Sequence, residues 1–302
     1  MSSDTGNVTN PVPTSGSTRD IAGALFVGVL SISLAASLFI KADPTHALSK
    51  AGIRLFIACA LLSPWVIRAW RKGQLSRRLV GHGFVAGLFY AIHFGTWVFS
   101  LEHTSITASV TLVTATPLLL AVWSLITGKD RPEIRHWIAI GLAFVGVSVI
   151  TQHDAAQGGS SLLGDLMALL GAAGMAGYFL TARRLGDTLD IWVFSGIATG
   201  FGALALWVTA LVQGIPFEPA SNEALMYLAL AALIPQLIGH TALTWVLRFK
   251  RPTIVGIATV GEPIGATLIG WLWLGLGVDT TTAVGCLITM AAVGVALYEP
   301  NR

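Results

Sequence analysis

Charged residues are scarce in this sequence. Asp, Glu, Lys and Arg make up 11% of the 302 residues, whereas a soluble domain carries about 25%. Hydrophobic residues make up 54%, and the mean hydropathy is +0.74. The composition excludes an ordinary soluble domain and indicates an integral membrane protein.

Cysteine is also rare, since Cys59 and Cys286 are the two in the chain and both fall inside apolar runs. They indicate no disulfide framework and no redox compartment. A signal peptide would need a basic start and a short apolar core near Met1, and neither is present. Residues 1–19 are rich in Ser, Thr, Asn, Pro and Gly, which predicts a disordered cytoplasmic tail on the mature protein.

Motifs of nucleotide binding and catalysis are missing as well. No G-x-x-x-x-G-K segment occurs, so we do not expect this chain alone to use ATP. Neither H-E-x-x-H nor G-x-S-x-G occurs, and the histidines have no carboxylate at ligand spacing. We therefore expect no enzyme, no cofactor and no metal site. An intramembrane enzyme and a non-transporting membrane sensor or assembly subunit are the alternative functions that the sequence leaves open.

Long apolar runs make up most of the chain. A helix needs about 17 to 25 apolar residues to cross a hydrocarbon core roughly 30 Å thick. The runs are continuous instead of alternating, which favours helices over barrel strands. Ten runs predict membrane spans: 21–40, 47–67, 80–101, 106–127, 137–150, 162–182, 191–212, 224–247, 253–275 and 281–297.

Basic residues collect in alternate connections between these runs. All of the 18 lie on one side except Lys41, Lys50 and Arg54. By the positive-inside rule that side is the cytoplasm, which predicts ten spans with both termini cytoplasmic. The excess of basic residues, which gives a pI near 9.1, therefore reflects the topology of the chain in the membrane. No basic cluster with aromatic or polar readers indicates nucleic-acid binding.

The third and fourth runs resemble the eighth and ninth. Three landmarks recur in order, with spacings that agree within two residues: His93, Trp97 and Thr116-Pro117 in the first half, and His240, Trp245 and Glu262-Pro263 in the second. Because five spans per copy is an odd number, the two copies are inverted relative to each other. This predicts an all-α integral membrane protein of ten transmembrane helices in two inverted five-helix repeats, residues 20–152 and 162–298. The substrate site of such a fold lies between the halves near the midplane.

Several short segments carry a resemblance to a known family: Gly261-Glu262-Pro263-Ile264-Gly265-Ala266, which is the most specific segment, Gly52-Ile53-Arg54-Leu55, Thr116-Pro117, Gly128-Lys129-Asp130-Arg131 with Trp137 and Gly146, Gly164-Asp165, and Gly239-His240-Thr241 with Trp245. In these segments the chain resembles the EamA-type branch of the drug/metabolite transporter superfamily. The resemblance implies a ten-helix carrier of metabolites in the bacterial inner membrane, in a family of which several members export amino acids and related compounds. It also implies a central cavity lined by the first, third, fourth, sixth, eighth and ninth spans.

Two features depart from the family pattern. Asp130 follows the fourth span, but the matching place after the ninth is Leu276. A Trp/Asn pattern common in the first span is replaced by Ser31, Ser33 and Ser37.

Glu262 is the leading candidate for function. It lies about ten residues, or roughly 15 Å of helix, beyond the basic turn at Arg251, which places it near the middle of the bilayer. An acid at that depth costs roughly 2.5 to 3.5 kcal/mol on insertion, so it indicates a functional site. Glu262 could exchange a proton or pair with a substrate ammonium. The alternative is a structural acid beside a kink at Pro263.

Polar residues in other spans are further candidates for substrate binding or proton coupling. His240 and His93 could relay protons or bind a ligand, or could simply pack through one interhelical hydrogen bond. Thr116 is the counterpart of Glu262 and cannot ionise. Arg54 either extends outward with Lys50 to the membrane surface or faces inward, where it could bind an anionic group.

Aromatic residues and prolines complete the candidate set. Tyr178, Trp97 and Trp245 could line an apolar cavity, or could pack against neighbouring helices. Pro117 and Pro263 sit inside their spans and predict kinks.

These features predict a secondary transporter that moves small polar or amphipathic metabolites by alternating access. The resemblance implies that it exports small metabolites such as amino acids or related compounds across the bacterial inner membrane. The driving force would be a proton gradient acting through Glu262 or the substrate gradient alone. The expected partners are a small-molecule substrate, H⁺ in the first case, and the lipid bilayer. The sequence does not indicate the oligomeric state.

Overall fold

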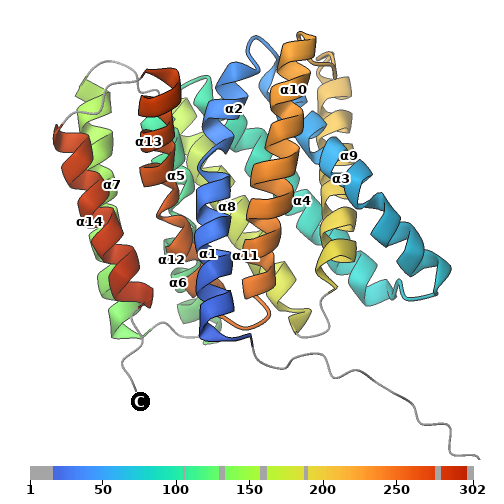
Figure 1. Cartoon of the computed structure of the whole chain (residues 1–302), viewed down its shortest axis with the longest axis horizontal. Coiled ribbons are helices and arrows are strands. Elements are labelled where there is room, and N and C mark those ends of the chain that lie inside the picture. The colour runs from blue at the N-terminus through green and yellow to red at the C-terminus, as the bar shows by residue number, and fades with distance from the viewer. Residues whose placement is uncertain are drawn as a thin grey trace, which may run out of the picture.

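The computed structural model describes residues 16–104, 106–128, 133–156, 162–186, 190–275 and 280–297. In these ranges the regular secondary structure is helical throughout, and no strand occurs in them (Figure 1). The prediction of an all-α protein is therefore confirmed. Residues 1–15 of the predicted tail, the segment 129–132 with Asp130, and Leu276 lie outside the described residues.

The helices follow one another along the chain as α1 (Thr18–Ile32), α2 (Ala35–Lys41), α3 (Ala47–Arg71), α4 (Arg77–Leu101), α5 (Ile106–Val113), α6 (Thr116–Thr127), α7 (Ile134–Ala156), α8 (Leu162–Arg183), α9 (Ile191–Val212), α10 (Asn222–Ala231), the π-helical segment η2 (Ala232–His240), α11 (Thr241–Val246), α12 (Pro252–Thr259), α13 (Glu262–Leu274) and α14 (Thr280–Leu297). α1 begins at Thr18, so its first two residues fall within the predicted tail. The cause is Ser17, whose Oγ accepts a hydrogen bond from the N–H of Asp20 at 3.1 Å and caps the helix.

Seven helical stretches in the described ranges are long and apolar enough to cross a membrane. They are Thr18–Lys41, Ala47–Arg71, Arg77–Leu101, Leu162–Arg183, Ile191–Val212, Asn222–Val246 and Pro252–Leu274. The chain is thus a multi-pass membrane protein. The other three predicted spans coincide with α5 and α6, with α7 and with α14, which are helical but not among the seven. The ten-span arrangement in two repeats stays a prediction.

The fourth predicted span is interrupted next to its proline. α5 ends at Val113 and α6 begins at Thr116, with Pro117 as the following residue. Proline has no N–H to donate, and its ring clashes with the carbonyl four residues before it, so a regular helix does not continue through this point.

The ninth predicted span is interrupted in the same way. α12 ends at Thr259 and α13 begins at Glu262, with Pro263 next. α6 and α13 also end alike, at Gly128 and Gly275, each with φ of 69°. Glycine adopts this left-handed conformation without a steric penalty, which closes the two helices 11 and 12 residues after their prolines.

Two further interruptions were not predicted. α1 and α2 are separated at Ser33, where no proline occurs; the Ser33 hydroxyl lies 2.8 Å from the carbonyl oxygen of Val29 and 3.3 Å from that of Glu262. A serine that bonds back to its own helix bends that helix. The eighth predicted span contains η2, whose wider turns include Pro235.

Helices from the two halves of the chain pack against each other throughout the interior. α3 and α4 pack on α9, α4 also on α8, α6 on α12, α5 on α13, and α1 on η2 and α11. Small residues allow the closest approaches. A Cβ at Gly174 would lie 2.7 Å from the backbone nitrogen of His93 and 2.9 Å from the carbonyl oxygen of Phe89, so α8 and α4 touch through their backbones.

The two ends of the bundle differ in charge. The turns after α3 and α11 and the end of α8 lie at the same end as the start of α1 (Figure 1, bottom), and they carry the basic groups Arg71, Arg77, Arg183, Arg248 and Arg251. We call this the basic end. The connections after α2, α4 and α9 lie at the opposite end and carry Asp43, Glu102, Glu218 and Glu223; we call it the acidic end.

Candidate functional site

A small cavity lies inside the bundle where the interrupted helices meet. It is lined by Ile32, Ala35, His93, Trp97, Val113, Thr114, Thr116, Met175, Phe179, His240, Leu243, Thr259 and Glu262. These residues belong to the first, third, fourth, sixth, eighth and ninth predicted spans, which is the set that the family resemblance implies. The cavity measures about 20 Å³, which is room for about one water molecule.

Glu262 brings a carboxylate to this cavity. Its side chain is 9% exposed, and in the described part of the chain no Lys, Arg or His nitrogen lies within 4.0 Å of it. Glu262 is the first residue of α13, so the unbonded N–H groups of that helix terminus favour a negative charge there. The site therefore holds a buried acid that faces the cavity instead of a neighbouring cation.

Thr116 lies at the matching place in the first half but is satisfied by the backbone. Its Oγ1 lies 3.1 Å from the carbonyl oxygen of Val113 and 3.3 Å from that of Ala172 on α8, and its proton serves one of them at a time. The hydroxyl ties α6 to α8 beside Pro117.

His93 and His240 come together at the cavity, with ring centroids 6.2 Å apart. The Nδ1 of His93 lies 2.8 Å from the carbonyl oxygen of Gly171 and bonds to it. The Nδ1 of His240 is buried and has no partner in the described residues. Trp97 stacks on His93 at 5.9 Å, and its Nε1 also lacks a partner there. Three of the predicted site residues thus form one wall.

Two of the predicted aromatic residues do not line the cavity. Tyr178 is fully buried, stacks on Tyr90 at 3.9 Å and exchanges a hydrogen bond of 2.9 Å with the hydroxyl of Thr244. Trp245 packs edge-on against Phe249 at 4.8 Å. Both residues support the helices behind the site.

Comparison with known proteins identifies the family. The sequence profile of the EamA-like transporter family matches residues 21–152 and 162–298. The chain belongs to this family.

The related proteins of this EamA-like transporter include several that are named as transporters. An uncharacterized transporter of Archaeoglobus fulgidus is 25% identical over 82% of this chain and 87% of its own. The uncharacterized transporter YdfC of Bacillus subtilis is 24% identical over 73% and 71%, and the uncharacterized inner membrane transporter YicL of Salmonella typhimurium is 22% identical over 68% and 69%. The names of these relatives agree with the expectation that the chain is no enzyme.

A protein of known crystal structure shares the fold. It superposes on this EamA-like transporter with a TM-score of 0.72 at 15% identity, over 92% of this chain and 97% of the other. At that identity the likeness bears on the fold alone.

Arg54 of this EamA-like transporter faces the interior, which shows that the outward orientation is wrong. The residue is 0% exposed, its Nη2 donates to the Oε1 of Gln236 at 2.9 Å, and its Cζ lies 4.2 Å from the ring centroid of Phe94. Arg54 does not line the cavity directly. Phe94 separates the two, because its ring also lies 5.3 Å from that of His240.

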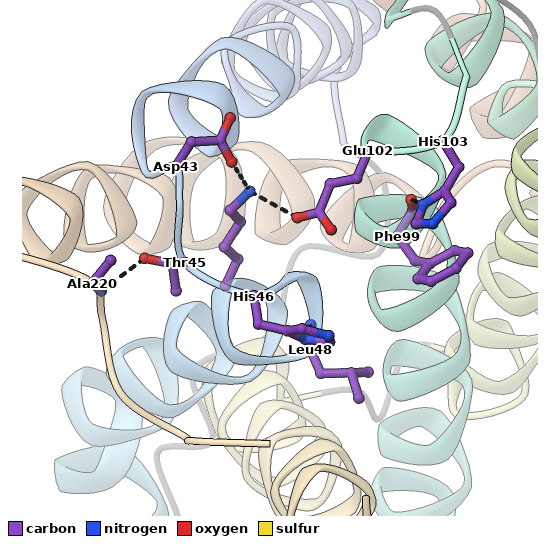
Figure 2. A network of polar contacts seen from close by, with 9 residues as sticks. Asp43, Thr45, His46, Leu48, Phe99, Glu102, His103 and Ala220 are labelled. Atoms are coloured by element: carbon purple, nitrogen blue, oxygen red, sulfur yellow. Dashed lines mark hydrogen bonds and ion pairs between the residues drawn. The ribbon is translucent and has the colours of Figure 1, made fainter. Parts of the chain in front are cut away.

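Lys50 has a different environment one turn away, at the acidic end. Its buried Nζ bonds to the carboxylates of Asp43 and of Glu102, the latter at 2.9 Å (Figure 2). Nearby, the N–H of Ala220 donates to Thr45 Oγ1 at 2.9 Å. These contacts join the α2–α3 turn to α4 and to the connection before α10.

Sequence reasoning missed several residues of the site. Gln236 could have been found, because it is a polar residue beside Pro235 inside an apolar run. Met175 and Phe179 gave no signal, since apolar side chains fill every face of these helices.

A larger hollow lies on the surface between α3 and α9 but has a different character. It measures about 550 Å³ and is lined by Ile53, Phe56, Cys59, Gly200, Ala203, Leu204, Trp207 and Phe217. Phe56 is 62% exposed and Leu204 51%, so this apolar surface faces lipid. The smaller central cavity, where ionisable groups converge, is the candidate site.

Proposed function

We propose that this EamA-like transporter is a secondary transporter that exports small metabolites, such as amino acids or related compounds, across the bacterial inner membrane by alternating access. One observation carries the proposal: six predicted spans, drawn from both halves of the chain, meet around a small internal cavity that Glu262 lines. Polar groups at a junction of interrupted helices are the usual substrate site of such carriers.

The proposal includes two inverted five-helix repeats, residues 20–152 and 162–298. In support, α5 and α6 break before Pro117 as α12 and α13 break before Pro263. The two interrupted spans also pack against each other in a crossed pattern, α5 on α13 and α6 on α12, as expected for halves related by an axis in the membrane plane.

The size of the cavity supports a closed state of the transport cycle. Its volume of about 20 Å³ is far below the roughly 300 to 1,000 Å³ of a pocket that binds a small molecule. A metabolite enters only after the halves separate at one end. The interrupted helices provide the joints for that movement, because hinge motions concentrate at the ends of elements.

The orientation in the membrane follows from charge. The basic end lies in the cytoplasm, together with both termini, and the acidic end faces outward, because Lys and Arg are retained on the cytoplasmic side. In the exporting direction the substrate enters at the basic end and leaves at the acidic end.

Counterflow in proteoliposomes tests the function. We expect solute exchange without ATP, and faster transport under an imposed pH difference if Glu262 carries protons. Glu262→Gln keeps the shape but cannot ionise, so it should remove the response to pH. Glu218→Gln, an identical change at an exposed residue, is the matched control.

Two results would count against the proposal in different ways. An unchanged rate and an unchanged pH response in Glu262→Gln would remove Glu262 from the mechanism and leave transport in place. A metabolite screen in which no solute moves under either condition would reject transport itself.

A further inference from the structure

Arg54 is the largest fully buried side chain in the described part of the protein, and most of its hydrogen-bonding capacity is unused. The Nη2 donates to Gln236 at 2.9 Å. The Nε and Nη1 are buried and have no partner in the described residues. No carboxylate of these residues lies within 4.0 Å of the guanidinium, including Glu262, which is the one buried acid among them.

Aromatic rings cover Arg54 but do not replace an anion. Its Cζ lies 4.2 Å from the ring centroid of Phe94 and 5.5 Å from that of Phe39. Rings attract the cation through their faces. They accept nothing from N–H groups that point within the guanidinium plane, so the unused donors stay unsatisfied.

Lys50 provides an internal comparison on the same helix. It is as buried as Arg54, but it contacts two carboxylates, those of Asp43 and Glu102. The protein therefore supplies anions to a buried cation whose role is structural. At Arg54, deeper in the same helix, it supplies one neutral amide and two rings.

The position of Arg54 connects it to the proposed transport site. Gln236, its only hydrogen-bond partner among the described residues, sits in η2 of the second half, and His240 of the same segment lines the cavity. Phe94 lies between Arg54 and His240, with its ring 5.3 Å from the imidazole. A shift of η2 against α3 and α4, as the halves separate, would expose the guanidinium to the cavity.

We propose that Arg54 binds a carboxylate of the transported solute, and that this EamA-like transporter therefore selects anionic or zwitterionic metabolites over the corresponding amides, which lack the negative charge. A carboxylate accepts charge-assisted hydrogen bonds from the Nε and Nη1 of Arg54 and brings a negative charge into direct contact with it, which no carboxylate of the described residues does within 4.0 Å. This inference rests on the proposed transport function and assigns the substrate class of the same site. Gln236 holds the guanidinium in position from the opposite half.

The test uses the full chain in proteoliposomes and measures transport rates for matched pairs of solutes. Each pair is an amino acid or keto acid, such as L-valine or pyruvate, with its amide, and the rate in protein-free vesicles is subtracted from each measured rate. We expect carboxylates to be transported at least about tenfold faster than their amides, because the amide has no negative charge to pair with Arg54. Arg54→Gln should abolish that preference. Arg54→Lys should keep part of it, because lysine retains the charge and loses the planar donor array.

Arg71→Gln is the matched control, the same change on the same helix at an exposed position of the basic end, and it should leave the preference unchanged. Size-exclusion profiles establish that each variant is folded.

Amides that move as fast as carboxylates in the wild-type protein would overturn the inference while transport stands. A folded Arg54→Gln that keeps the carboxylate preference would also overturn it. Should Arg54→Gln not fold, an unchanged carboxylate-to-amide ratio in Arg54→Lys would have the same effect. If the wild-type protein moves no solute of either class, the transport proposal fails and this inference with it.

Discussion

Glu262 and Thr116 occupy matched places beside the two prolines, yet they depend on their surroundings in different ways. Two backbone carbonyls satisfy the Thr116 hydroxyl, and they would do so whatever the cavity contained. The Glu262 carboxylate has no cation within 4.0 Å in the described residues and faces the cavity. Any ionisable chemistry at these two positions therefore belongs to the second half.

The two histidines at the cavity also differ in whether the ring nitrogen Nδ1 has a hydrogen-bond partner, and the effect of this difference can be measured. His93 bonds to the Gly171 carbonyl on α8, and in membranes an interhelical hydrogen bond contributes on average about 0.6 and at most about 1.7 kcal/mol. The Nδ1 of His240 has no partner in the described residues. We expect His93→Phe to lower the thermal unfolding temperature measurably. His240→Phe should lower the transport rate with a smaller effect on unfolding.

Thermal unfolding of the purified variants and initial rates of counterflow separate the two roles. Phenylalanine keeps the ring and its packing in both variants, so each serves as the control for the other. Equal losses of stability and of rate in both would show that the histidines act alike, against this prediction.

At the scale of whole elements, the bundle is organised by interruptions in its helices. The breaks before Pro117 and Pro263 could be predicted, because proline has no N–H to donate and its ring clashes with the preceding turn. A proline does not always break a helix here, since α3 continues through Pro64. The break at Ser33 could not. It depends on hydrogen bonds of the Ser33 hydroxyl to Val29 and to the carbonyl of Glu262, 229 residues away, and serine in most helices causes no break.

The orientation of helices about their own axes also escaped prediction. In a soluble helix a polar face marks the solvent side, but here nearly every face is apolar, so the sequence did not show whether Arg54 faced lipid or interior. Packing decided it, since α3 presents Arg54 to Phe94 and Gln236. The pairing of His93 with His240 was accessible from sequence because the two halves repeat the same landmarks.

The contact between α4 and α8 gives a prediction at the same scale. A methyl group at Gly174 would meet the backbone of His93 and Phe89 below 3.0 Å, and backbone cannot rotate away as a side chain can. We expect Gly174→Ala to destabilise the protein by about 1 to 3 kcal/mol, the usual effect of overpacking. Gly141→Ala is the control, because nothing lies within 4 Å of a Cβ there. Unfolding in detergent compares the two, and equal stabilities would contradict the close approach of α4 and α8.

For the whole molecule, the acidic end is closed by contacts within and between the halves. Lys50 joins the α2–α3 turn to Glu102 at the end of α4. Thr45 in the same turn and Ser49 in the first turn of α3 bond to the connection before α10, through the N–H of Ala220 at 2.9 Å and the carbonyl of Pro216 at 2.6 Å. In the proposed export cycle this end must open for release, and these contacts hold the α2–α3 turn and the start of α3.

Lys50→Met should therefore shift the closed-to-open equilibrium toward opening at the acidic end. Ion pairs with a partly exposed partner contribute about 0.2 to 1 kcal/mol each, so losing both should raise access to the cavity a few-fold. Access is measured at Ala35→Cys, a cavity residue, with Cys59 and Cys286 replaced by serine, as the labelling rate by a membrane-impermeant maleimide added at the acidic side. Lys72→Met, directly after the same helix at the basic end, should leave the rate unchanged. Labelling of Lys50→Met at the wild-type rate would mean that Thr45 and Ser49 are sufficient to hold the end closed.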